Sequence, residues 1–88
     1  MLNFVVMNRN EHYFLRDKRI LLVDDEQVVL DMLESLLKEE GFSSIFKCGT
    51  KKDALEQYAL HQPEFTILDV MLPDGDGFSL LREIRKSE

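Results

Sequence analysis

The sequence predicts an α/β fold, in which a parallel β-sheet carries helices on both faces. Short apolar runs alternate with amphipathic helical patterns along residues 19–88, and two of those apolar runs end directly on acidic residues. Glycine or proline follows each of the first two helical patterns. Alternation of this kind produces parallel strands, because each helix crosses back over the sheet before the next strand begins. The predicted order is strand, helix, strand, helix, strand, helix, arranged in three layers.

The first strand is predicted over residues 19–23, which lead directly into Asp24 and Asp25. A helix is expected to follow and to run through Glu40, where Gly41 supplies the stop. Its apolar positions recur at helical spacing: Val29, Met32, Leu33, Leu36 and Leu37.

The second strand is predicted over residues 43–47, and Thr50 is expected to cap a second helix that ends at Pro63. Residues 65–69 form the third predicted strand, which ends on Asp69. A turn rich in glycine and aspartate follows it, and Asp76 is expected to cap the third helix.

The composition limits the chain to one small domain, since it has only 88 residues. Its 44% hydrophobic and 32% charged residues are typical of a soluble globular protein, and no apolar stretch approaches the roughly 18 residues that span a bilayer. The net charge of −6 disfavours contact with phosphate backbones, which relies on clustered lysine and arginine. We therefore predict neither a direct nucleic-acid contact nor a membrane span.

Cys48 is the only cysteine, so no disulfide can form within the chain. A lone thiol suits a reducing compartment, and we predict a cytoplasmic location. Residues 1–18 lie outside the alternating pattern and are interpreted as an N-terminal extension, in which residues 2–7 could form an extra strand or stay frayed. Residues 19–88 are then a separate, partial domain.

Acidic residues end two of the predicted strands: Asp24 and Asp25 after the first, and Asp69 at the third. If these strands are parallel neighbours, their carboxyl ends share the sheet edge where ligands usually bind. Crowded carboxylates raise one another's pKa unless a cation or a proton intervenes. Oxygen-only ligation with room for water suits Mg²⁺, which often pairs with a substrate phosphate. The sequence therefore predicts metal-assisted phosphoryl chemistry at this edge.

Two motifs together resemble the receiver domain of two-component response regulators. They are Asp24-Asp25-Glu26 after the first strand, and Asp69 followed by Leu72-Pro73 and Asp76-Gly77-Phe78. The resemblance covers residues 19–88 and implies a flavodoxin-like receiver fold with strand order 2-1-3. It also implies a phosphoprotein of a phosphorelay whose partner is a histidine kinase.

The resemblance assigns roles to four residues. It implies that Asp69 is the phosphoacceptor, that Asp25 binds Mg²⁺ directly, and that Asp24 assists through water. The backbone carbonyl of Met71 is then a further ligand, and Asp69 itself completes the metal site. Receivers of this kind are not enzymes beyond their own phosphorylation and dephosphorylation.

A complete receiver has five strand–helix units, and this sequence contains three, so the resemblance implies a fold truncated after the third. The Ser or Thr of the fourth strand and the Lys of the fifth are not in the chain. Without that lysine, phosphoryl transfer is expected to be slower, because it depends on positioned positive charge. The third strand is also expected to expose an edge, which favours pairing with residues 2–7 or with another copy as a homo-oligomer.

The same residues allow other interpretations. The first is a truncated, switch-deficient receiver fragment that acts as a non-catalytic interaction or self-association module. A calcium-binding loop over residues 72–83 is disfavoured, because Leu72 would occupy its first ligand position. A haloacid-dehalogenase-type phosphatase is excluded, because that class of enzyme needs a second acid two positions after the first, and Met71 occupies that position.

Overall fold

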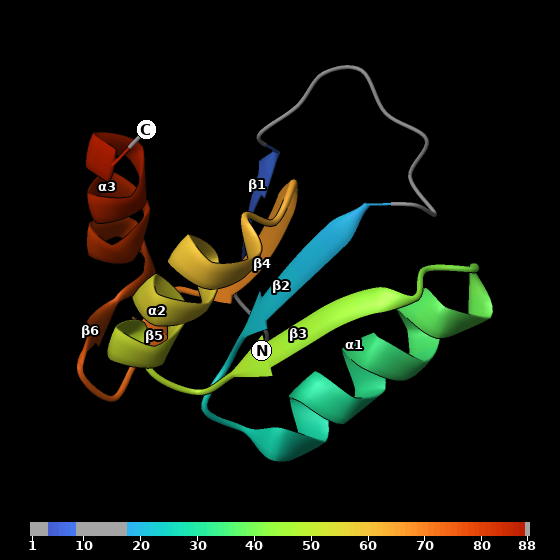
Figure 1. Cartoon of the computed structure of the whole chain (residues 1–88). Helices are drawn as coiled ribbons and strands as arrows, with labels where there is room; N and C mark the ends of the chain where they lie inside the picture. Colours follow the sequence, from blue (N-terminus) through green and yellow to red (C-terminus); the bar gives the residue numbers. More distant parts are fainter. Residues whose placement is uncertain (1–3, 9–17, 88) are drawn as a thin grey trace.

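The computed structural model describes residues 4–8 and 18–87, and it contains the three strand–helix units in the predicted order (Figure 1). The elements are β1 (Phe4–Asn8), β2 (Arg19–Val23), α1 (Gln27–Glu39), β3 (Ser44–Cys48), α2 (Lys51–His61), β4 (Phe65–Asp69), β5 (Met71–Leu72), β6 (Gly75–Asp76) and α3 (Gly77–Ser87). The short β5–β6 hairpin stands where the sequence indicated only a turn.

The main sheet has the strand order β1-β4-β2-β3. The central strand β2 pairs in parallel with both β3 and β4, so the order 2-1-3 expected for the three predicted strands is confirmed. The reason is visible in the burial of β2, whose last four residues are all buried, as a strand covered on both faces requires.

Helices cover both faces of this sheet, with α1 on one side and α2 and α3 on the other (Figure 1). Alternate residues of β2 point to opposite faces, so Ile20 and Leu22 pack with Leu30 of α1. Leu21 and Val23 join the opposite cluster, together with Ala54, Tyr58, Leu68, Leu80 and Ile84. The predicted three-layer arrangement is therefore confirmed.

Helix α1 ends at Glu39, one residue before the predicted end at Glu40, and Gly41 supplies the stop as predicted, since its φ of 98° lies in the left-handed region that favours glycine. The amide of Gly41 donates to the Lys38 carbonyl and that of Phe42 to the Leu37 carbonyl, both at 3.0 Å. These two bonds satisfy carbonyls that the end of the helix would otherwise leave without partners.

The predicted buried face of α1 is partly wrong. Met32 and Leu36 are 43% and 52% exposed, and Val28, one turn before them, is 80% exposed. Val29 is buried as predicted, Leu33 and Leu37 pack against the core, and Leu30 is buried although it was not on the predicted face. The helix therefore carries an apolar outer stripe of Val28, Met32 and Leu36, because its core-facing side is shifted toward Leu30.

The other helix starts match the sequence. Thr50 accepts a hydrogen bond from the Asp53 amide at 3.1 Å, and Asp76 accepts one from the Ser79 amide at 2.7 Å. Helix α2 ends before Pro63 through Gln62, which has a left-handed φ of 50°. Within the described residues, no helix is long and apolar enough to cross a membrane.

The outer edge of β4 is paired. Strand β1 runs antiparallel along it, with Phe4 opposite Asp69 and Asn8 opposite Phe65. The sequence had left open that residues 2–7 would pair there, and residues 4–8 do so. Of the two ways in which this edge was expected to be covered, pairing with the N-terminal residues is the one that the structure contains, and self-association through the edge would require β1 to leave. The rest of the N-terminal extension, residues 1–3 and 9–17, lies outside the described residues.

Candidate functional site

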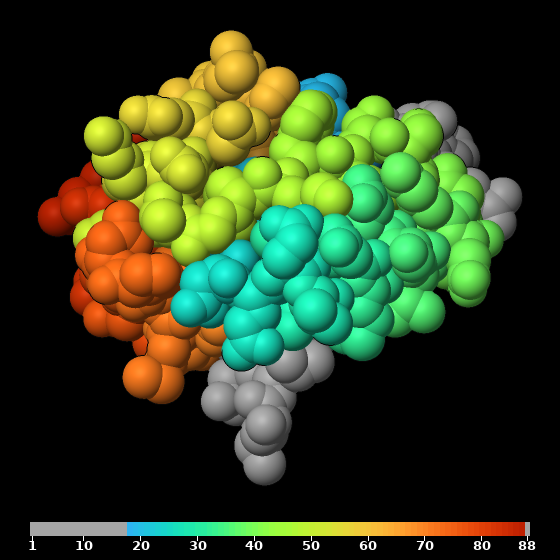
Figure 2. Space-filling model, turned by 90° about the horizontal axis from the view of Figure 1, so that it is seen from below, coloured from blue at the N-terminus to red at the C-terminus, as the bar shows by residue number. Residues whose placement is uncertain are grey.

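The site forms where β2 and β4 end side by side. Val23 pairs with Leu68 across the two strands, so the next residues, Asp24 and Asp69, come to the same edge of the sheet. Carboxylate oxygens of Asp24, Asp25 and Asp69 all lie within 4.8 Å of one another. The segments after β2 and β4 and the start of α2 also meet on one surface of the molecule (Figure 2).

Asp24 is the buried member of this cluster, with only 2% of its surface exposed. Its Oδ1 accepts a hydrogen bond from the Glu26 amide at 2.9 Å, and its own amide donates to the Cys48 carbonyl at 3.1 Å. Burial raises the pKa of the Asp24 carboxyl above its ordinary value. The charges of Asp69 and Asp25 raise it further, against the opposing effect of the Glu26 hydrogen bond.

Asp69 and Asp25 are more accessible than Asp24, since Asp69 is half-buried and Asp25 is exposed. Asp69 is oriented by a hydrogen bond of 3.1 Å that its Oδ1 accepts from the Met71 amide. The Met71 side chain points into solvent and contributes no donor atom to the cluster, so only the main chain of Met71 is placed to take part.

Gly77 supports the end of β4 by having no side chain. Its amide donates to the Val70 carbonyl at 2.7 Å, and a Cβ atom at this position would lie 2.5 Å from the Asp69 carbonyl oxygen and would also collide with Leu68. Helix α3 can therefore begin directly beneath Asp69 only with glycine at this position. The sequence indicated Gly77 as part of a motif, but it did not show this contact.

Asp74 has a structural role that sequence reasoning missed. Its carboxylate accepts hydrogen bonds from the amides of Lys51 and Lys52, at 2.7 and 3.0 Å, at the first turn of α2. These bonds hold the pKa of Asp74 below its usual range, with the Lys51 bond as the largest cause. No signal in the sequence relates an aspartate in one turn to a helix that begins more than twenty residues earlier.

The cluster fits a small divalent cation. Its donors are carboxylate oxygens, which Mg²⁺ prefers, and their number leaves positions for water and for a phosphate. None of the ion pairs among residues 18–87 involves Asp24, Asp25 or Asp69. Burial is the largest cause of the raised pKa of Asp24, and the charges of Asp69 and Asp25 add to it, so a cation bound here would favour the charged carboxylate.

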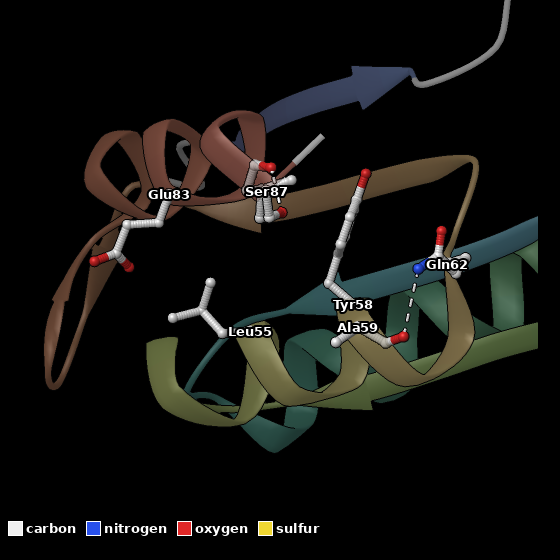
Figure 3. A pocket seen from close by; sticks show the side chains of 7 residues that line it. Leu55, Tyr58, Ala59, Gln62, Glu83 and Ser87 are labelled. Carbon is white, nitrogen blue, oxygen red and sulfur yellow. Dashed lines mark hydrogen bonds between the residues drawn. The ribbon is translucent and has the colours of Figure 1, made fainter.

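A groove of about 600 Å³ lies between α2 and α3, away from the acid cluster (Figure 3). Leu55, Tyr58 and Ala59 line it from α2, and Glu83, Ile84 and Ser87 line it from α3. None of the clustered acids lines this groove, so it is separate from the acid cluster at the sheet edge.

Comparison with known proteins decides the family. The family model described as the response regulator receiver domain matches residues 20–88. The chain belongs to the response regulator receiver family. This receiver is also 44% identical over 72 residues to Regulatory protein VanRc of Enterococcus gallinarum. That match covers 80% of the chain but only 30% of VanRc, so the chain spans less than a third of this curated relative.

Family membership places the chain in two-component signalling, where receivers interact with histidine kinases and are generally not classical enzymes. Receivers typically bind Mg²⁺ at an acidic pocket, and Asp24, Asp25 and Asp69 form such a cluster here.

Proposed function

We propose that this receiver accepts a phosphoryl group from a histidine kinase onto Asp69. The observation that carries the proposal is the meeting of three carboxylates at the ends of two parallel strands, with Asp69 as the last residue of β4. Because the Met71 amide binds Oδ1 of Asp69, the other carboxylate oxygen, Oδ2, is the nucleophile.

In the proposed reaction, Oδ2 of Asp69 attacks the phosphorus of a phosphohistidine on the kinase. The new bond joins this oxygen to phosphorus while the phosphorus–nitrogen bond breaks, and its electron pair returns to the imidazole, which takes up a proton. The product is an acyl phosphate on Asp69. The hydrogen bond from Met71 keeps the carboxylate in one orientation, which matters because phosphoryl transfer requires an in-line approach.

We assign the cation site to Asp25 as a direct ligand, Asp24 through water, Asp69, and the main-chain carbonyl of Met71. When bound there, Mg²⁺ would neutralise charge on the phosphoryl oxygens and on the acids themselves. Asp24 has a specific part in this proposal: a cation would relieve the repulsion that Asp69 and Asp25 exert on its buried charge.

We also propose that residues 1–18 are an extension of a partial receiver domain at 19–88, and that the protein works in the cytoplasm without contacting nucleic acid directly. The acidic charge balance and the single cysteine support the last two points. Homo-oligomer formation through the β4 edge stays a prediction, because β1 occupies that edge here.

The test is incubation of the chain with Mg²⁺ and acetyl phosphate, followed by intact mass spectrometry. A mass increase of one phosphoryl group is expected in the wild-type chain and not in Asp69→Asn. Omission of Mg²⁺ is expected to abolish the adduct as well.

Asp53→Asn is the matched control, because Asp53 is an exposed acid of α2 outside the cluster and its loss changes the net charge equally. This variant should be phosphorylated as the wild type is. An adduct that persists in Asp69→Asn, or that never forms on the folded wild-type chain, would overturn the proposal.

A second candidate function is supported by the apolar outer stripe of α1. Val28, Met32 and Leu36 recur every four residues on one exposed helix face, which is typical of a surface that binds another protein. A switch-deficient receiver fragment could use this stripe as a non-catalytic interaction module. The two functions separate by experiment: Met32→Lys would abolish partner binding by a non-catalytic module, whereas Asp69→Asn would leave the function of that module intact.

A further inference from the structure

The hairpin β5–β6 joins the acid cluster to helix α2. The hairpin begins at Met71, whose amide donates a hydrogen bond to the Asp69 carboxylate. Its two strands pair Met71 with Asp76 and Leu72 with Gly75. The turn between the two short strands holds Asp74, whose carboxylate binds the first two amides of α2. One end of the hairpin therefore orients Asp69, while its tip is fastened to a different helix.

The contacts of Asp74 replace bonds that a helix cannot make by itself. The first amides of any α-helix have no partner within the helix, and a carboxylate at that end is also favoured by the helix dipole. In α2, Thr50 satisfies the amide of Asp53, and Asp74 satisfies those of Lys51 and Lys52. The N-terminus of α2 is thus capped from two directions, one local and one through the hairpin.

Lys51 strengthens the same connection with its side chain. The ammonium group lies 3.3 Å from a carboxylate oxygen of Glu83 on α3, while the Lys51 amide binds Asp74. The aliphatic stem passes so close to Gly75 that a Cβ atom there would be 2.9 Å from Lys51 Cδ. The hairpin is therefore held between the start of α2 and the body of α3.

We propose that Asp74 is a positioning residue for the phosphorylation of Asp69. By binding the start of α2, Asp74 fixes the hairpin and therefore the main chain of Met71, which orients the Asp69 carboxylate and supplies the proposed carbonyl ligand. The inference rests on the proposed function. It adds that the reactivity of Asp69 depends on a side chain at the tip of the hairpin, which binds α2 and not the acid cluster.

The experiment compares Asp74→Ala, Asp74→Asn and the control Asp53→Ala, which removes an equal charge from the first turn of α2. Three quantities are measured below the unfolding transition of each variant: the maximal rate of adduct formation with acetyl phosphate, the Mg²⁺ affinity by titration without phosphodonor, and the hydrogen exchange of the Met71 amide.

For Asp74→Ala we expect a maximal rate lower by about tenfold or more, because small displacements of reacting groups have effects of this order. The Mg²⁺ affinity should fall and the Met71 amide should exchange faster. Asp74→Asn should recover part of each loss, since its amide oxygen still accepts a hydrogen bond from α2. Asp53→Ala should match the wild type in all three measurements.

A purely structural role for Asp74 gives a different pattern. Asp74→Ala would then lower the melting temperature, while the folded molecules would keep the wild-type rate, Mg²⁺ affinity and Met71 protection; that result would overturn the inference. If the wild-type chain forms no adduct, the proposed function fails, but exchange of the Met71 amide still decides whether Asp74 positions the hairpin.

Discussion

The segment after β2 and the segment after β4 deliver acids to the same cluster, but they are held in place differently. Asp24 is fixed by its neighbours, through the Glu26 amide two residues on and the adjoining strand β3. Asp69 is followed by a hairpin whose tip binds α2, and the first residue of α3, Gly77, then lies against the end of β4. Both acids accept a hydrogen bond from an amide two residues on, but the segment after β4 is also fastened by the side chain of Asp74 to a separate helix.

The strongest test of this contrast compares Gly77, which lies against the end of β4, with Gly49, which lies beside the segment after β2. Gly77→Ala should destabilise the fold by about 2–4 kcal/mol and abolish phosphorylation of Asp69, because the new methyl group would collide with the Asp69 carbonyl and with Leu68. Chemical denaturation and the adduct assay measure the two effects.

Gly49→Ala is the matched control beside the first segment. A Cβ atom there would lie 3.5 Å from the Asp24 carbonyl oxygen, which is ordinary contact, and the stability should change by less than about 1 kcal/mol. Equal losses in the two variants would show that the two segments do not differ in the way described.

Removal of residues 1–17 should have the next largest effect, and the loss of stability should fall on β4 and the segment after it. Strand β4 would lose β1 and expose an unpaired edge, so the shortened chain should associate in a concentration-dependent way. Sedimentation measures the association. Hydrogen exchange should show loosening of β4 near Asp69, whereas β2 should keep its protection because β3 and β4 still flank it. A shortened chain that stays monomeric and protected throughout would contradict this prediction.

The pH dependence of unfolding should have opposite signs for one acid in each segment. The pKa of Asp24 is raised in the folded state, so its charge costs stability at neutral pH and this cost is relieved as pH falls through the folded pKa. The pKa of Asp74 is lowered, so its contribution is complete above the unfolded pKa and is lost as pH falls through the folded value.

Denaturation curves at several pH values, recorded without divalent cations, test these signs. At neutral pH, Asp24→Asn should be more stable than the wild type and Asp74→Asn less stable, and both differences should shrink in acid. If both variants were more stable than the wild type, or both less stable, then the charge of Asp24 would not be repelled in the folded state or Asp74 would not stabilise α2 as a cap.

The smallest expected effect is on the chemical labelling of Cys48, whose carbonyl accepts a hydrogen bond from the Asp24 amide. Burial raises the pKa of its thiol to about 12, so a thiolate-specific reagent should label the folded chain very slowly and the unfolded chain quickly. Because Cys48 lies beside the first segment, Asp74→Ala should leave the labelling rate of the folded chain unchanged. Faster labelling in that variant would mean that the two segments loosen together.

Much of this arrangement could be read from the sequence, because it depends on residues close together in the chain. Thr50, Asp76 and Gly41 act as caps where predicted, and the strand bounds agree with the apolar runs to within one residue. Local spacing was less informative for α1, where Met32 and Leu36 fit the helical pattern but face solvent. Helical periodicity shows that an apolar face exists, but the packing of the helix on the sheet decides which residues it covers.

The sequence by itself determined the order of strands and helices, their caps, and the acids at two strand ends, since each depends on backbone preferences and neighbouring side chains. Only the tertiary structure decided that β1 pairs with β4, that Asp74 caps α2, and that Gly77 passes beneath Asp69. These three contacts join residues whose separation along the chain carries no pattern. They form because burial of the apolar faces first brings the elements together, and the backbone groups left without partners then bind what lies nearest.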